Sequence, residues 1–309
     1  MGKKGKKAQA GKPKKLTPKD VGKRLDALAK KVEEELNGAD LFAPLPPTED
    51  CAICFVPLSH LNSEACYSAC CGKVICWACF KENNESIKKQ NKKNAGDKKA
   101  IASFCPFCRE HASFCPFCRE PDPTSNLESL RQLQARCLQN DHVAFTAMGD
   151  RYQNGKNGTP KNGLKALDCF IRAIELGSPE ACNCIGEIYH EGNGVAVDKE
   201  RAALFIRVGA LRGSIVARHG IGFSEYHDLD NHEIGIRHFK IAAEAGFQLS
   251  LDALRSIYSS DGNELLPGNE FITKECLDFA YRACHEAQMQ VKSEEREKYR
   301  SKVQANKST

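Results

Sequence analysis

Eleven of the seventeen cysteines in this chain of 309 residues fall between positions 51 and 118. They form four Cys-x-x-Cys pairs and one adjacent Cys-Cys pair, with a single cysteine left over. Thiolate sulfur is a preferred zinc ligand, and a Cys-x-x-Cys pair on a tight loop supplies two of the four tetrahedral positions. The adjacent Cys-Cys pair and three Cys-x-x-Cys pairs, counting only one of the last two, supply eight sulfurs. Eight sulfurs predict two zinc ions per chain, each in a closed structural site that leaves no coordination position for catalysis. The pairs are Cys51/Cys54, Cys70/Cys71, Cys76/Cys79, Cys105/Cys108 and Cys115/Cys118, and Cys66 is the extra residue.

The rest of the sequence favours metal ligation over disulfides. The chain has no apolar run long enough to cross a membrane, and its basic start lacks the apolar region of a secretory signal. We therefore expect a cytoplasmic protein with reduced thiols, with the nucleus as the alternative, and no membrane partner. A redox pair would need a thioredoxin-like βαβ context, which the sequence does not offer.

The order of the cysteine pairs resembles a RING finger. In that family two zinc sites interleave, so the resemblance implies one zinc on the first and third pairs and a second zinc on the other two. Lys73 stands where the common RING has a histidine ligand, and Cys70 supplies the missing sulfur in an all-cysteine version, with Cys66 as its rival. The implied ligands are Cys51, Cys54, Cys76 and Cys79 for the first zinc, and Cys70, Cys71, Cys115 and Cys118 for the second.

The last pair occurs twice. The nine residues ASFCPFCRE stand at 102–110 and again at 112–120, so only one copy can complete the second site. The second copy is followed by Pro121-Asp122-Pro123, a normal exit from a RING domain, which favours Cys115 and Cys118. Cys105 and Cys108 remain the alternative ligands.

The resemblance also implies an activity. RING domains act as ubiquitin ligases that carry no nucleophile and instead dock a ubiquitin-conjugating enzyme on an apolar surface. The matching residues here are Ile53, Pro116 and Phe117, and Arg119 occupies the place of the arginine that braces ubiquitin. Many RING-like folds are inert, so a zinc-binding interaction scaffold without catalysis is the alternative. Trp77 is expected to pack between the zinc loops.

The segments before and inside the cysteine block are polar or amphipathic. Residues 1–16 are expected to be a disordered basic tail, and nucleic-acid binding through it is not favoured because short lysine runs are weak signals. Residues 17–37 predict a helix, because Thr17-Pro18 suits a helix start and apolar residues follow at three- and four-residue steps. Residues 38–50 read as a Pro-rich linker, and residues 81–99 as a Lys-rich loop within a RING domain spanning 51–120.

From residue 127 to residue 290 the sequence repeats itself. Gly177, Gly213 and Gly246 close three similar segments, which predicts stacked helix–turn–helix units with small residues where the helices approach closely. The phrase from Ile185 to Ala202 resembles the Sel1-like repeat, a relative of the tetratricopeptide repeat, and this implies a surface for a protein substrate or adaptor. Residues 291–309 read as a polar helix and tail.

These observations predict a small zinc-stabilised α+β RING domain followed by an all-α helical-repeat solenoid. The six cysteines beyond the block are expected to be packing residues, because no histidine and acid accompany them at a readable spacing. The four histidines between positions 219 and 238 do not share a helix face and are not favoured as a metal site.

Overall fold

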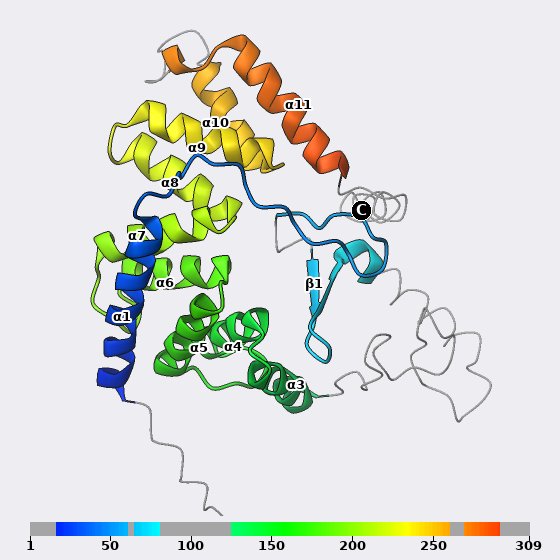
Figure 1. The fold of residues 1–309 in the computed structure, drawn as a ribbon, viewed down its shortest axis with the longest axis vertical. Coiled ribbons are helices and arrows are strands. Elements are labelled where there is room, and N and C mark those ends of the chain that lie inside the picture. Colours follow the sequence, from blue (N-terminus) through cyan, green and yellow to red (C-terminus); the bar gives the residue numbers. More distant parts are fainter. Residues whose placement is uncertain (1–16, 61–64, 81–124, 260–268, 291–309) are drawn as a thin grey trace, which may run out of the picture.

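The structure is a computed structural model that describes residues 17–60, 65–80, 125–259 and 269–290. The basic tail, the Lys-rich loop, both CPFC copies and the C-terminal tail lie outside these residues. Most of the described chain forms a stack of helices, to which one further helix and a small cysteine-containing module are attached (Figure 1). The helices of the stack are α3 (Asn126–Leu138), α4 (His142–Asn154), α5 (Gly163–Glu175), α6 (Pro179–Glu191), α7 (Lys199–Leu211), α8 (Ile215–His227), α9 (His232–Glu244), α10 (Gln248–Tyr258) and α11 (Lys274–Gln290), with a 3-10 turn, η2, at Asn269–Phe271.

The stack is built from helix pairs, and the prediction of a helical-repeat solenoid is confirmed. The pairs α4/α5, α6/α7 and α8/α9 make the most extensive contacts, and each pair also packs against the next. Glycines on the first helix of each pair let the second helix approach closely, as the repeat pattern predicts. A Cβ added at Gly149, Gly186 or Gly222 would lie 2.4 to 2.8 Å from a side chain of the partner helix (Phe170, Ile206 or Phe239).

Hydrogen bonds between equivalent side chains join one helix pair to the next. Thr146 contacts Ser178 (3.1 Å), Asn183 donates to Ser214 (2.7 Å), and His219 contacts Ser250 (2.8 Å). Ser178 and Ser214 also cap α6 and α8 by accepting from backbone N–H groups. The serines therefore link the start of each later pair to the first helix of the pair before it.

The first helix, α1 (Pro18–Leu36), lies across the side of the stack (Figure 1). Thr17 caps its N-terminus, and its apolar stripe (Val21, Leu25, Leu28 and Val32) is buried. The stripe packs on α5 and α7 within the same chain. Ion pairs flank it, from Glu35 to Arg212 (2.6 Å), from Asp26 to Arg201 (2.7 Å) and from Arg24 to Asp168. The stripe is thus covered by the repeats.

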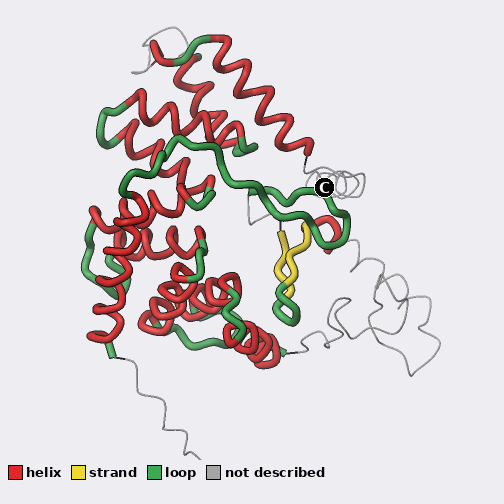
Figure 2. The backbone as a smooth tube through the Cα atoms, viewed as in Figure 1, coloured by secondary structure: helices red, strands yellow, loops and turns green. Residues whose placement is uncertain are grey.

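The segment after α1, which we call the strap (residues 37–49), runs over α8 and α9 toward the cysteine module (Figure 2). The sequence suggests a linker here, but the structure shows a packed segment. The guanidinium carbon (Cζ) of Arg237 lies over the Phe42 ring, 3.7 Å from the ring centre. The same ring packs against the ring of His238. Leu45 packs on the cluster formed by Ile215, Ala242 and Phe247. Local composition did not reveal these contacts because their partners lie far away in the sequence.

The cysteine module follows the strap and contains an antiparallel hairpin. Strand β1 (Ala65–Ser68) pairs with β2 (Lys73–Cys76), with Ala65 opposite Cys76 and Ser68 opposite Lys73. Gly72 takes a φ of 74° in the connecting turn, a conformation that glycine adopts at little cost. The hairpin is fixed to the repeats because the Tyr67 hydroxyl donates to Asp141 at the start of α4 (2.7 Å).

Candidate metal centre

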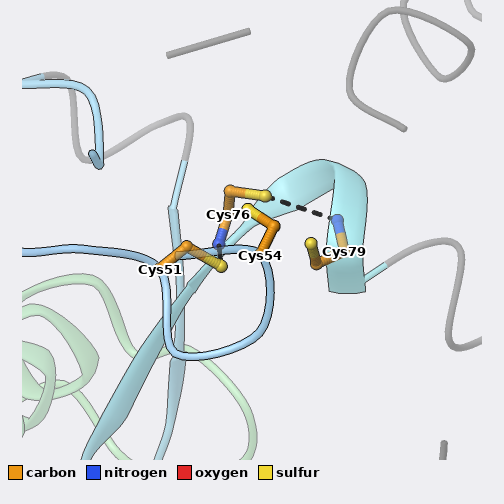
Figure 3. Close-up of side chains that lie close together, drawn as sticks. All are labelled: Cys51, Cys54, Cys76 and Cys79. Carbon is orange, nitrogen blue, oxygen red and sulfur yellow. Dashed lines mark hydrogen bonds between the residues drawn. The ribbon is translucent and has the colours of Figure 1, made fainter. Parts of the chain in front are cut away.

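Four cysteine sulfurs converge at one end of the hairpin (Figure 3). Cys51 and Cys54 lie on the loop that leads into the module, Cys76 ends β2, and Cys79 lies in the helical turn that follows. Their sulfur atoms are all within 4.8 Å of one another. The structure therefore brings together the four residues that the resemblance assigns to the first zinc.

The geometry of the four sulfurs fits zinc. A tetrahedral site with Zn–S bonds of about 2.3 Å places its sulfurs about 3.8 Å apart, so a small inward movement would close the site around an ion. Cys51, Cys76 and Cys79 are buried, and the four cysteines form no disulfide. Four sulfurs with no fifth donor make a closed site, which holds a fold together and does not activate water.

Backbone and thiol hydrogen bonds organise the site before any ion enters. The N–H of Cys76 donates to the sulfur of Cys51 (3.3 Å), and the N–H of Cys79 donates to the sulfur of Cys76 (3.4 Å). Hydrogen bonds from the thiols of Cys76 and Cys79 hold the pKa of Cys51 well below its usual range. The same contacts raise the pKa of both partners. A thiolate among protonated thiols attracts a cation, and binding of the cation would release the remaining protons.

The second predicted site is described only in part. Cys70 and Cys71 lie in the turn at the far end of the hairpin, away from the first four cysteines. They therefore lie outside the first four-sulfur group, with Lys73 close by in sequence at the start of β2. Cys115 and Cys118, and the alternatives Cys105 and Cys108, lie outside the described residues. Among the described residues, the only group of three or more ligand-type side chains close enough to share a metal is the first set of four.

Cys66 lies in the middle of β1, opposite Ile75. Burial raises the pKa of its thiol to about 11, which favours the neutral form. Its strand position and neutral thiol agree with a packing role.

Apolar side chains surround the four-cysteine site on its open side. Ile53 is half-buried, whereas Phe55, which directly follows Cys54, is 76% exposed and takes a φ of 54°. Trp77 is 40% exposed and stacks on Phe80. Its packing between the zinc loops stays a prediction, because both CPFC copies lie outside the described residues. The sequence reasoning overlooked Phe55, although its place directly after a ligand was a usable signal. Pro116, Phe117 and Arg119 lie outside the described residues.

The cysteines on α3, α5 and α6 behave as packing residues, whereas a side-chain hydrogen bond with Thr273 lowers the pKa of the Cys276 thiol at the start of α11. Burial raises the pKa of the Cys137 thiol to about 11 and of the Cys169, Cys182 and Cys184 thiols to about 12. A thiol held neutral is a poor nucleophile. His219 and His238 are packed among aromatic rings. In the described part of the chain, no helix is both long and apolar enough to span a membrane.

Comparison with known proteins identifies the repeats. Three copies of the Sel1 repeat match residues 146–178, 179–214 and 219–247. An uncharacterized protein of Neisseria meningitidis serogroup B is 33% identical over 95 residues, which cover 31% of this chain and 20% of that relative. The residues matched by the Sel1 repeat run from within α4 to the residue before α10, so the C-terminal part of the chain contains Sel1 repeats.

Two solved structures show partial similarity to this chain. A Sel1 repeat protein from Oxalobacter formigenes is 28% identical, with a TM-score of 0.41, and the match covers 50% of this chain and 64% of that one. A protective antigen of uropathogenic Escherichia coli with an SLR fold is 24% identical, with a TM-score of 0.44, covering 54% of this chain and 35% of that one. The chain thus spans less than two thirds of each of these relatives.

Proposed function

We propose that the protein is a RING-type ubiquitin ligase whose Sel1 repeats hold a protein substrate or adaptor. The observation that carries this proposal is the grouping of the cysteines. The first pair, Cys51/Cys54, meets the third pair, Cys76/Cys79, while Cys70 and Cys71 remain at the opposite end of the hairpin. A simple zinc ribbon would join consecutive pairs, whereas skipping the second pair is the interleaved order of a RING.

In this proposal two zinc ions provide structure and take no part in transfer. Cys51, Cys54, Cys76 and Cys79 hold the first ion. Cys70 and Cys71 hold the second together with Cys115 and Cys118, or with Cys105 and Cys108 in their place. The protein supplies no nucleophile, and its contribution is to dock a ubiquitin-conjugating enzyme and hold its ubiquitin thioester in a reactive arrangement.

The exposed apolar side chains beside the four-cysteine site support a docking role. Phe55 directly follows Cys54, Trp77 directly follows Cys76, and both expose large apolar groups to solvent. Exposed aromatic groups of this kind are enriched at protein interfaces, where their burial provides much of the binding energy. Pro116 and Phe117 would complete this surface, and Arg119 would contact ubiquitin.

The repeats provide the second half of the function. Sel1 repeats are protein-interaction modules, so this part of the chain is a scaffold for protein partners. The scaffold has a defined position relative to the cysteine module, because Tyr67 is bonded to Asp141 and the strap packs on α8 and α9. A partner on the repeats would therefore be presented at a fixed distance from a docked conjugating enzyme.

Autoubiquitination in a reconstituted assay tests the proposal. The wild-type protein, incubated with ubiquitin, activating enzyme and a panel of conjugating enzymes, should form ubiquitin conjugates. Ile53→Ala should reduce them strongly, while Phe279→Ala, which alters an exposed phenylalanine on α11, should not. No product with any conjugating enzyme from zinc-loaded protein would exclude the ligase function and leave the interaction scaffold.

A further inference from the structure

The turns that join successive helix pairs form a regular series along the stack. In each turn, the residue directly before the N-cap of the next helix has a positive φ. These residues are Asn140 (57°), Gly177 (96°), Gly213 (104°) and Gly246 (93°). The four turns occupy equivalent places in the stack, and the three with glycine offer bare backbone. What lies against each of them can be compared directly.

Other parts of the same chain cover three of these turns. Beside Asn140, the hairpin turn of the cysteine module packs so closely that a Cβ on Gly72 would lie 2.8 Å from the Asp141 carboxylate. The strap covers Gly213, since a Cβ there would lie 2.7 Å from Cγ of Pro46. Helix α11 covers Gly246, whose carbonyl accepts a hydrogen bond from Gln288 (3.2 Å).

The remaining turn is open. Among the described residues, no atom beyond its chain neighbours lies within 4 Å of a Cβ placed on Gly177. Gly177 lines an open pocket of about 580 Å³, which the strap, the hairpin, α4 and the start of α6 also line. This volume is in the usual range of ligand sites. Nδ1 of His142, another lining residue, is buried and finds no hydrogen-bond partner in the described part of the chain.

The covered turn at Gly213 shows what kind of chain fits such a surface. There the ring of Pro46 lies directly on the Cα of Gly213, and the strap has neither helix nor strand on either side of it. Proline is already restricted to extended backbone, so it loses little conformational entropy on binding. Gly177 offers the same backbone conformation to a second extended segment.

The charges that line the pocket select for a basic ligand. Three carboxylates, those of Glu49, Asp150 and Glu180, border it. The one lysine or arginine among the described lining residues is Arg212, and Glu35 on α1 engages its guanidinium with two hydrogen bonds (2.9 and 2.6 Å). Asp150 pairs with exposed Lys156 (3.1 Å), which leaves the acidic groups in excess.

We propose that the pocket at Gly177 binds an extended, proline-containing basic peptide of a second protein, with its proline seated on Gly177 as Pro46 is seated on Gly213. This inference deepens the proposed function, because it names the chemistry of the partner that the repeats hold. The site itself does not depend on ubiquitin transfer. A pure interaction scaffold would have the same site.

Fluorescence anisotropy with a labelled peptide of sequence KKLPPKK tests the site on the full-length, zinc-loaded protein. We expect saturable binding that weakens at least about tenfold when the prolines are replaced (KKLAAKK) or the charges are reversed (EELPPEE). Glu180→Gln should weaken binding of KKLPPKK and reduce its dependence on salt. No saturation by KKLPPKK, or equal binding of the three peptides, would overturn the proposal.

A matched pair of glycine variants separates the site from general loss of stability. Gly177→Ala and Gly194→Ala place a Cβ at positions of similar positive φ (96° and 91°) with no described atom within 4 Å. Both variants should destabilise the fold by a similar amount, but only Gly177→Ala should lower the affinity for the KKLPPKK peptide. Equal peptide affinities for the two variants would overturn the site. Autoubiquitination of Gly177→Ala should match that of Gly194→Ala, so failure of this site and failure of the ligase proposal are distinguishable.

Discussion

Arg218 on α8 donates a hydrogen bond from Nη1 to the carbonyl oxygen of Leu41 in the strap, a residue 177 positions earlier in the chain. Its Nη2 donates to the carbonyl of Ala210 at the end of α7 (3.1 Å), and the side chain is 1% exposed. Buried charges are costly unless they are hydrogen-bonded. The two carbonyls accept from Nη1 and Nη2, while Nε is buried without a hydrogen-bond partner among the described residues. The guanidinium thereby joins the strap to two helices of the stack.

Replacing this arginine should detach the strap. Arg218→Met keeps most of the apolar stem but removes the donor to the half-buried Leu41 carbonyl and one donor to the Ala210 carbonyl, which still accepts from the Gly213 N–H. We therefore expect a loss of about 1–3 kcal/mol in the free energy of unfolding. Urea denaturation measures it. Arg282→Met, at an exposed residue of α11 that donates to its own helix, should change stability by less than about 0.5 kcal/mol. Equal effects would show that Arg218 does not anchor the strap.

Two glycines in the repeats should respond to alanine with opposite signs. Gly186→Ala would place its Cβ 2.6 Å from Ile206 and 3.3 Å from the Ala202 carbonyl, and overpacking of this kind costs about 1–3 kcal/mol. Gly220→Ala lies in α8 with nothing within 4 Å in the described residues, and removing a helical glycine should stabilise by about 0.5–1 kcal/mol. Thermal unfolding of both variants checks the pair. Destabilisation by both would mean that close helix contact is not the deciding factor.

Zinc binding should depend on the four converging cysteines. Cys51→Ser should remove one equivalent of zinc per chain, because serine is a poor ligand and the other three sulfurs cannot close a tetrahedral site. Cys66→Ser is the control, since Cys66 lies on the strand and outside the four-sulfur group. Native mass spectrometry counts the ions. Loss of zinc from Cys66→Ser with retention in Cys51→Ser would contradict the assignment.

His238 should make stability depend on pH. Burial, followed by the nearby charges of Arg218, Arg207 and Arg237, lowers the pKa of His238 to about 4. The unfolded chain therefore takes up a proton between about pH 6.5 and pH 4 that the folded chain does not, and stability falls as the pH drops through this window. This histidine should account for about 2 kcal/mol of the loss between pH 7.5 and pH 5.

His238→Phe keeps a ring against Phe42 but has no group that titrates there. The variant should therefore lose about 2 kcal/mol less stability than the wild type between pH 7.5 and pH 5. His227→Phe, at an exposed position, should lose as much stability as the wild type. Urea unfolding of both variants and the wild type at the two pH values gives the comparison. If His238→Phe and the wild type lose the same amount of stability, burial of a neutral His238 is not the cause.

The sequence predicted the elements whose signals are local. The apolar stripe from Val21 to Val32 predicted α1, and the glycines that recur at equivalent places predicted the helix pairs. It left open what α1 covers, because an amphipathic stripe does not identify its partner. The strap was missed for a related reason: Phe42 and Leu41 find their partners on α8 and α9, far along the chain.

The metal centre was predictable because ligand spacing carries chemistry directly. Cys-x-x-Cys pairs identify sulfurs that can share an ion, and their order suggested which pairs meet. The exposed side chains around the site were harder to predict, as Phe55 shows. Whether an aromatic ring lies between loops or on the surface depends on the conformation of the loops, which the residue types alone do not predict.

The strap also changes how the repeat array should fold. A repeat stack with contacts only between neighbours can unfold piece by piece from either end. Here the segment from α1 to Pro46 contacts α5, α7, α8 and α9 within one continuous stretch of chain. Unfolding any one of these four helices breaks contacts with the N-terminal segment, which the other three also contact. The central repeat units should therefore unfold together in a single transition. The order of docking also differs from the order of synthesis. The N-terminal segment is made first, but it can dock only after most of the chain that follows it has been made.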